Sequence, residues 1–92
     1  MYFLYIIYSK TLNKYYVGVT HDLKSRIEKH NQHCYSKAYT KAAFDWEYKL
    51  QMEYSKDEAL YLEKFIKKMK SKKFIEKVIN NTRILDNIIE KR

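Results

Sequence analysis

Arg26 and His30 are the pair of residues in this sequence best suited to phosphate chemistry. On a helix, which turns by about 100° per residue, they share one side with Leu23 and Ile27. Arg26 is the only arginine among the first 82 residues, and a guanidinium group holds phosphate oxygens through a planar fork. The alternative is that Arg26 pairs with an acid and that His30 only suits the negative end of a helix dipole.

Two stretches of the chain predict neighbouring strands. Residues 2–8 are apolar on both alternating faces, which is typical of a strand covered on both sides, and residues 15–20 are rich in β-forming residues. A hairpin is the simplest connection between them. A two-residue turn at residues 11–12 would pair Lys10 with Asn13 and so fix the register.

That register places two tyrosines, Tyr5 and Tyr16, on one side of the sheet. Tyr5 would face Gly18, and Ile7 would face Tyr16. Gly18 would leave open space above the Tyr5 phenol, although a glycine in a strand can also mark a bulge. Because a tyrosine in a strand is more often a packing residue than a catalytic one, the prediction depends on the combination of residues.

Residues 46–54 predict a third strand at an edge of the sheet. Apolar and polar residues alternate along it, so one face would contact the core and the other would contact water. Residues 32–45, which precede it, have weak periodicity and could contain a helical turn near residues 37–43. The expected apolar face consists of Trp46, Tyr48, Leu50, Met52 and Tyr54.

Capping residues predict where the helices begin. Thr20 would cap a helix over residues 21–31, and further helices would follow Ser55, Ser71 and Thr82. Ser55 opens a capping box, after which apolar residues recur at helical spacing. This apolar stripe consists of Ala59, Leu62, Ile66 and Met69.

These elements predict one domain over residues 1–92, with a core at about residues 1–80 and a C-terminal helix at about residues 82–90. The predicted fold class is α/β of the α+β type, with a small three-stranded antiparallel sheet flanked by helices. No apolar stretch is long enough to span a membrane, and Cys34 is the only cysteine. We therefore expect a cytoplasmic protein without membrane contact.

The net charge of +8 indicates a polyanionic partner, for which nucleic acid is the first candidate. A lysine-rich surface that only maintains solubility is the alternative. The lysines expected to hold a nucleic-acid backbone without reading bases are Lys64, Lys67, Lys68, Lys70, Lys72 and Lys73.

Glu63 lies roughly 40° from Ala59 at the rim of the apolar stripe. It could reach inward, or it could form an ordinary i,i+4 ion pair with Lys67. A zinc site built from the histidines and Cys34 is disfavoured, because the usual paired spacing of zinc ligands is absent.

At these positions the chain resembles the GIY-YIG nuclease domain, most closely in its short stand-alone form. Residues 3–5 stand where the family has its GIY motif, although Phe and Leu replace Gly and Ile, and residues 16–18 stand for YIG. Arg26 follows ten residues after the second tyrosine, His30 four residues later, and Glu63 lies in the expected helix. The resemblance covers about residues 1–80, and Phe74 and Ile75 occupy the region where some members carry an Asn.

The resemblance implies a metal-dependent endonuclease that hydrolyses DNA, with RNA not excluded. Glu63 would bind one Mg²⁺ or Mn²⁺, and Arg26 would hold the nonbridging phosphate oxygens. Tyr5 is the expected general base, since a nearby cation can lower the pKa of a phenol. Tyr16 and His30 would position water and phosphate, and the roles of these three residues could be exchanged.

Two other functions remain open from the sequence. The chain could be a nucleic-acid-binding module that keeps the fold without cleavage, or a basic protein whose partner is another protein. The sequence predicts neither an oligomeric state nor a preferred substrate structure.

Overall fold

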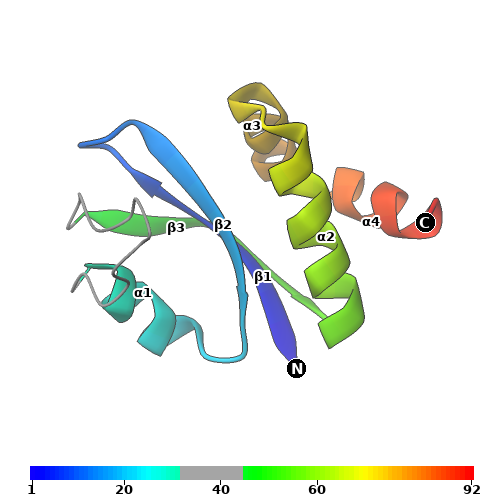
Figure 1. The fold of residues 1–92 in the computed structure, drawn as a ribbon, viewed down its shortest axis with the longest axis horizontal. Helices are drawn as coiled ribbons and strands as arrows, with labels where there is room; N and C mark the ends of the chain where they lie inside the picture. The colour runs from blue at the N-terminus through cyan, green and yellow to red at the C-terminus, as the bar shows by residue number, and fades with distance from the viewer. Residues whose placement is uncertain (32–44) are drawn as a thin grey trace.

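The computed structural model describes residues 1–31 and 45–92 and shows an α+β fold, as predicted. The possible helical turn at residues 37–43, together with His33 and Cys34, lies outside these ranges. Three antiparallel strands form a sheet in the order β2-β1-β3. Helix α1 lies on one face of this sheet, and α2 with the helices that follow it lies on the other (Figure 1). The elements are β1 (Tyr2–Ser9), β2 (Lys14–Thr20), α1 (Leu23–Asn31), β3 (Trp46–Tyr54), α2 (Lys56–Met69), α3 (Lys72–Asn80) and α4 (Arg83–Glu90).

The hairpin between β1 and β2 has the predicted register, with Tyr5 opposite Gly18. Each strand is one residue longer than predicted, ending at Ser9 and beginning at Lys14, but the predicted two-residue turn is wrong because positions 10 and 13 are not paired. Asp45 explains this difference, because its carboxylate accepts hydrogen bonds from Ser9 Oγ at 2.7 Å and from the backbone N and Oγ1 of Thr11, each at 3.0 Å. These bonds hold the connecting loop against the beginning of β3.

A β-bulge interrupts the pairing of β1 with β3. Ile6 pairs with Leu50, whereas the next residue, Ile7, pairs with Tyr48. Lys49 is therefore an extra residue on β3, and an extra residue turns the strand relative to its partner. The edge position of β3 agrees with the prediction, but its alternating pattern does not continue on one face through the bulge.

The bulge divides the apolar residues of β3 between two cores. Trp46 and Tyr48 pack with Tyr5 and Ile7 on the face covered by α1. The rest of the strand packs on the opposite face, so the single apolar face predicted for residues 46–54 is wrong. The apolar residues of β3 on this second face are Leu50, Met52 and Tyr54.

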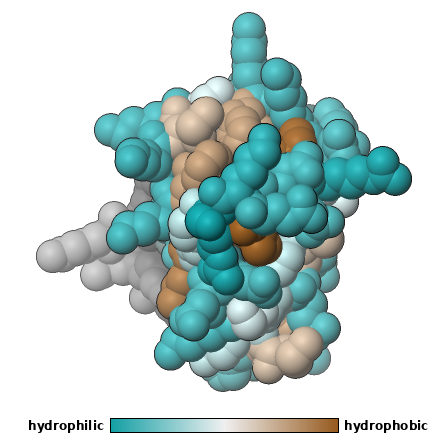
Figure 2. Space-filling view, turned by 90° about the vertical axis from the view of Figure 1, so that its right-hand side faces the viewer, coloured by the Kyte–Doolittle hydropathy of each residue, from teal (hydrophilic) through white to brown (hydrophobic). Residues whose placement is uncertain are grey.

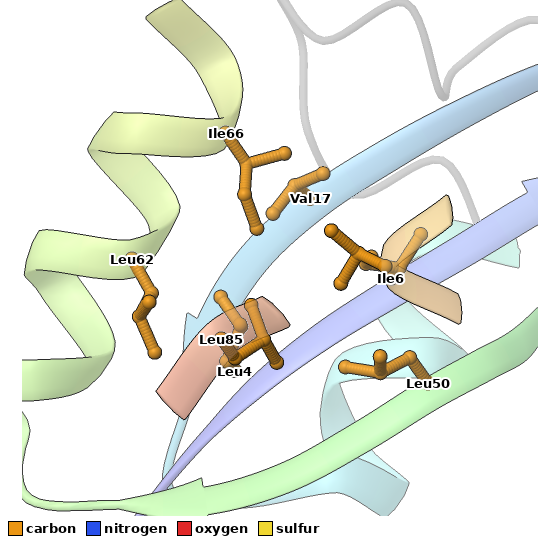
Figure 3. Close-up of a cluster of buried hydrophobic side chains, with 8 residues drawn as sticks. Leu4, Ile6, Val17, Leu50, Leu62, Ile66 and Leu85 are labelled. Atoms are coloured by element: carbon orange, nitrogen blue, oxygen red, sulfur yellow. The ribbon is translucent and has the colours of Figure 1, made fainter. Parts of the chain in front are cut away.

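The larger core lies between the sheet and α2, α3 and α4 (Figure 3). Burial of each of its aliphatic side chains contributes about 1.5–3 kcal/mol relative to leaving it exposed. Met69 was expected to extend the apolar stripe of α2 but is 47% exposed, because the stripe leaves the sheet after Ile66. The fully buried members of this core include Leu4, Ile6, Leu62, Ile66, Val78 and Leu85.

Two helix starts agree with the sequence prediction. Ser55 and Glu58 form the capping box of α2, with Ser55 Oγ accepting from the Glu58 backbone N at 3.3 Å. Ser71 Oγ accepts from Phe74 N at 3.1 Å at the start of α3. None of the helices in the described ranges is both long and apolar enough to cross a membrane.

The two helix starts predicted after threonines have different outcomes: α1 begins at Leu23, two residues later than predicted after Thr20, whereas α4 begins directly after Thr82 as predicted. Thr20 bonds both backbone groups of Asp22 at the end of β2, and Asp22 Oδ1 instead accepts from Ser25 N at the start of α1. Thr82 makes no capping bond through its side chain, whereas Asn81 Oδ1 accepts from Arg83 N at 3.2 Å.

Candidate active site

The centre of the candidate site is the phenol of Tyr5, which lies directly over Gly18. A Cβ atom at position 18 would come within 2.4 Å of the Tyr5 oxygen and 2.5 Å of Cζ. The sequence predicted open space here, but the structure shows that the Tyr5 phenol itself fills the space above Gly18. The β1–β2 register is continuous here, so the glycine does not mark a bulge but permits this close approach.

His30 of α1 contacts the oxygen of the Tyr5 phenol. A hydrogen bond of 3.0 Å joins the Tyr5 oxygen to His30 Nε2, and each of the two side chains is only 1% exposed. Burial and, to a lesser degree, the nearby charge of Arg26 together lower the pKa of His30 to about 4. The imidazole is therefore neutral near pH 7, and Arg26 lies within electrostatic reach of it.

Tyr16 lies beside this pair at the edge of the sheet. Its ring centroid is 4.9 Å from that of His30 and 6.5 Å from that of Tyr5. Unlike Tyr5, Tyr16 is partly exposed. The structure therefore brings four of the five predicted site residues, from β1, β2 and α1, into one cluster: Tyr5, Tyr16, Arg26 and His30.

Lys67 connects Glu63 on α2 to this cluster, because it contacts both Glu63 and the ring of Tyr16. The ammonium nitrogen of Lys67 lies 3.1 Å from Glu63 Oε2 and 5.3 Å from the centre of the Tyr16 ring. The i,i+4 ion pair considered in the sequence analysis is thus present. The Glu63 side chain keeps 23% of its surface exposed.

Residues on β3 and at the end of α1 also shape the site, and sequence analysis missed them. The Tyr48 ring stands at 89° to the Tyr5 ring at 5.8 Å, and its hydroxyl donates to the Leu23 carbonyl. The side chain of Asn31 bonds the backbone N of Trp46 at 2.8 Å and its carbonyl at 3.1 Å. The alternation of residues 46–54 identified Tyr48 as a strand residue. Nothing in the local sequence indicates the bulge that turns it toward Tyr5.

The six predicted backbone-binding lysines lie on different surfaces. Lys67, Lys70 and Lys72 line a groove between β2 and the junction of α2 with α3. Lys64 and Lys68 line two other hollows along α2, one of which they share with Lys67. Figure 2 shows that the side of the molecule carrying α4 is mostly hydrophilic, with small hydrophobic areas between the polar side chains.

The three-stranded sheet, the two neighbouring tyrosines and the helix that carries Arg26 and His30 form a small α+β fold. Comparison with protein families matches residues 1–77 to the GIY-YIG catalytic domain. The match spans most of the 92 residues, and the chain belongs to the GIY-YIG family. Searches of curated proteins and of solved structures give no significant match.

Members of this family are generally nucleases that hydrolyse phosphodiester bonds with a divalent metal ion. Family membership therefore supports a nuclease-type function for this chain in general, with nucleic acid as the class of substrate. Within residues 1–31 and 45–92, no three His, Cys, Asp or Glu side chains gather into a metal site made by the protein alone.

Proposed function

We propose that this chain is a divalent-metal-dependent endonuclease that hydrolyses phosphodiester bonds in DNA. The observation that carries the proposal is the 3.0 Å contact between the Tyr5 phenol and a buried, neutral His30. A neutral imidazole with its proton on Nδ1 presents Nε2 as an acceptor. The Tyr5 hydroxyl can therefore donate a hydrogen bond to a neutral His30, which orients the phenol oxygen as the candidate general base toward a water molecule.

The electrostatics around Tyr5 support this role. Arg26 lies close enough to His30 to lower its pKa, so a positive charge is present beside the Tyr5–His30 pair. Arg26 would also hold the nonbridging oxygens of the scissile phosphate, for which a guanidinium is better suited than an ammonium. Because Tyr5 is 1% exposed, water must be brought to it with the substrate. Tyr16, which is partly exposed, is the second candidate for the base.

The donor set at Glu63 fits Mg²⁺ or Mn²⁺. Hard cations of this kind bind to one or two carboxylates and to substrate phosphates, and they keep several waters. Glu63 supplies one partly exposed carboxylate that already binds the ammonium group of Lys67. The metal ion would stabilise negative charge on the phosphate and the leaving oxygen. Glu63 would hold it beside Tyr16, and the lysines on and after α2 would hold the backbone of the DNA.

Cleavage of supercoiled plasmid in Mg²⁺ or Mn²⁺ tests the proposal. Glu63→Gln keeps the shape of the side chain but removes its charge, and it should abolish nicking while DNA binding survives. Glu47→Gln is the matched control, because Glu47 is also ion-paired with a lysine, at 2.9 Å from Lys49, but lies on β3. Equal cleavage by Glu63→Gln and the wild type would refute the metal-ligand role. Binding without cleavage by the wild type would favour an inactive binding module.

A further inference from the structure

A groove of about 540 Å³ runs along the start of β2 and the junction of α2 with α3. This volume lies within the range of small-ligand sites, roughly 300–1,000 Å³. The floor of the groove is apolar and is formed by Val17, Ile66 and Ile75. Val17 and Ile66 are buried core residues, so the floor is fixed by the packing of α2 on the sheet.

The rim of the groove is strongly basic. Four exposed lysines line it, and no Asp or Glu is among the described residues that do so. Asn13 and Ser71 add polar groups at the same rim, where the Lys72 ammonium lies 2.9 Å from Asn13 Oδ1. An apolar floor beneath a ring of cations suits a ligand that has both a flat apolar part and negative charges. The rim lysines are Lys14, Lys67, Lys70 and Lys72.

The groove shares Tyr16 and Lys67 with the candidate active site at the edge of β2, although Tyr5 packs on the opposite face of the sheet from the groove floor. Tyr16 and Lys67 line the groove, and the same Tyr16 ring lies 4.9 Å from the His30 ring. Lys67 lies over Tyr16 and also contacts Glu63. A strand with a phosphate beside Tyr16 would therefore meet the groove with its neighbouring nucleotide.

We propose that this groove binds an unpaired nucleotide next to the scissile phosphate, with its base on the apolar floor and the adjoining phosphates on the rim lysines. This inference rests on the proposed nuclease function and adds a substrate feature to it. A base can lie on the floor only if it is unpaired, because in a duplex its flat faces are stacked between neighbours. Backbone binding alone would need the lysines but not the apolar floor.

Binding without metal tests the groove separately from cleavage. Fluorescence anisotropy in EDTA would compare a labelled duplex that carries a single-stranded thymidine tail with a blunt duplex of equal total phosphate count. The tailed duplex should bind about tenfold more tightly, since base contacts of this kind typically change affinity by that order. A third probe has the same tail with abasic sugars, which keep the phosphates and remove the bases, and it should lose most of that advantage.

Groove variants locate the effect. Ile75→Ala removes part of the floor and should reduce the difference between the thymidine and abasic tails to about twofold. If this variant is partly unfolded, its apparent affinities for the thymidine-tailed and abasic-tailed duplexes fall by the same factor. The ratio of the two affinities therefore still measures the contribution of the apolar floor. Ile88→Ala, which shortens an α4 side chain outside the groove, should keep the full difference.

A second variant tests the rim without disturbing the backbone. Lys70 has a left-handed conformation with φ 48°, which glycine adopts without strain. Lys70→Gly should weaken binding of the tailed duplex more than that of the blunt duplex. Lys73→Ala removes the same charge from a residue that does not line the groove and should weaken both equally.

The proposal is overturned by equal binding of tailed and blunt duplexes, by equal binding of thymidine and abasic tails, or by an unchanged difference in Ile75→Ala. It is also overturned if sedimentation shows that a second copy of the chain occupies the groove and leaves when Lys70 is replaced. If the wild-type protein shows these binding differences but cleaves no plasmid, the proposed nuclease activity is refuted and the proposed nucleotide site is retained.

Discussion

The ammonium group of Lys67 lies between Glu63 and Tyr16, 3.1 Å from the Glu63 carboxylate and 5.3 Å above the Tyr16 ring. A cation therefore already occupies the position between the proposed metal ligand and a proposed catalytic tyrosine. A divalent ion bound at Glu63, as proposed, would compete with the ammonium group of Lys67 for the same carboxylate. A phosphate backbone that draws Lys67 away would favour metal binding, so substrate and metal binding would support each other.

Lys67→Met should raise the affinity of the protein for Mn²⁺ in the absence of nucleic acid. The gain should be about twofold, since an i,i+4 ion pair at a partly exposed site contributes only about 0.3–0.5 kcal/mol. Electron paramagnetic resonance of unbound Mn²⁺ measures it directly. Lys49→Met, which breaks the Glu47 ion pair on β3, should leave Mn²⁺ affinity unchanged. Unchanged or weaker binding by Lys67→Met would argue against competition at Glu63.

Replacement of the tyrosines should separate their roles in cleavage. Tyr5→Phe removes the proposed general base and should lower the cleavage rate by about 10²–10⁴-fold. Tyr16→Phe, if Tyr16 only positions water, should lower it less. The reverse order would assign the base to Tyr16. Single-turnover cleavage with saturating metal and enzyme measures the chemical step, and circular dichroism checks that both variants fold.

Gly18→Ala should destabilise the protein by about 1–3 kcal/mol, as expected for overpacking in a closely packed core. The new methyl group would meet the Tyr5 phenol at 2.4 Å, so the ring must move and its bond to His30 must lengthen. Urea denaturation measures the loss. In a Tyr5→Ala background the same substitution should cost less, because the ring is gone. If Gly18→Ala lowers the free energy of unfolding equally in both backgrounds, contact with the Tyr5 ring is not the cause of the destabilisation.

Stability should fall as the pH decreases from about 6.5 to about 4. His30 has a lowered pKa of about 4 in the folded protein, so over this range the unfolded chain binds a proton that the folded protein does not. The full loss is up to about 3 kcal/mol and is complete below the folded pKa. Urea midpoints across this range measure it. His30→Gln should flatten the slope and His21→Gln should not; a slope that persists in His30→Gln would contradict the assignment.

Much of the fold could be predicted from the sequence because the signals are local. Alternation and apolar runs gave the three strands, and the serine caps gave the starts of α2 and α3. The parity of the hairpin placed Tyr5 opposite Gly18, since a strand has a repeat of two residues. Helical spacing placed Arg26 and His30 on one side of α1.

Only the tertiary structure decided how these pieces meet. The bulge at Lys49 turns Trp46 and Tyr48 toward Tyr5, although their own strand alternates without interruption. The approach of α2 to the edge of β2 brings Lys67 over Tyr16 and so places Glu63 near the site. Both arrangements depend on contacts between residues distant in the sequence.

The sequence by itself determined a small basic α+β domain with Tyr5, Tyr16, Arg26 and His30 on surfaces that could face one another. Local periodicity is enough for this, because it fixes the side of an element on which a residue lies. The tertiary structure decided that the phenol of Tyr5 fills the space above Gly18 and bonds a neutral His30. Packing decides these features, because distance, burial and charge are properties of neighbours that the chain brings together only when it folds.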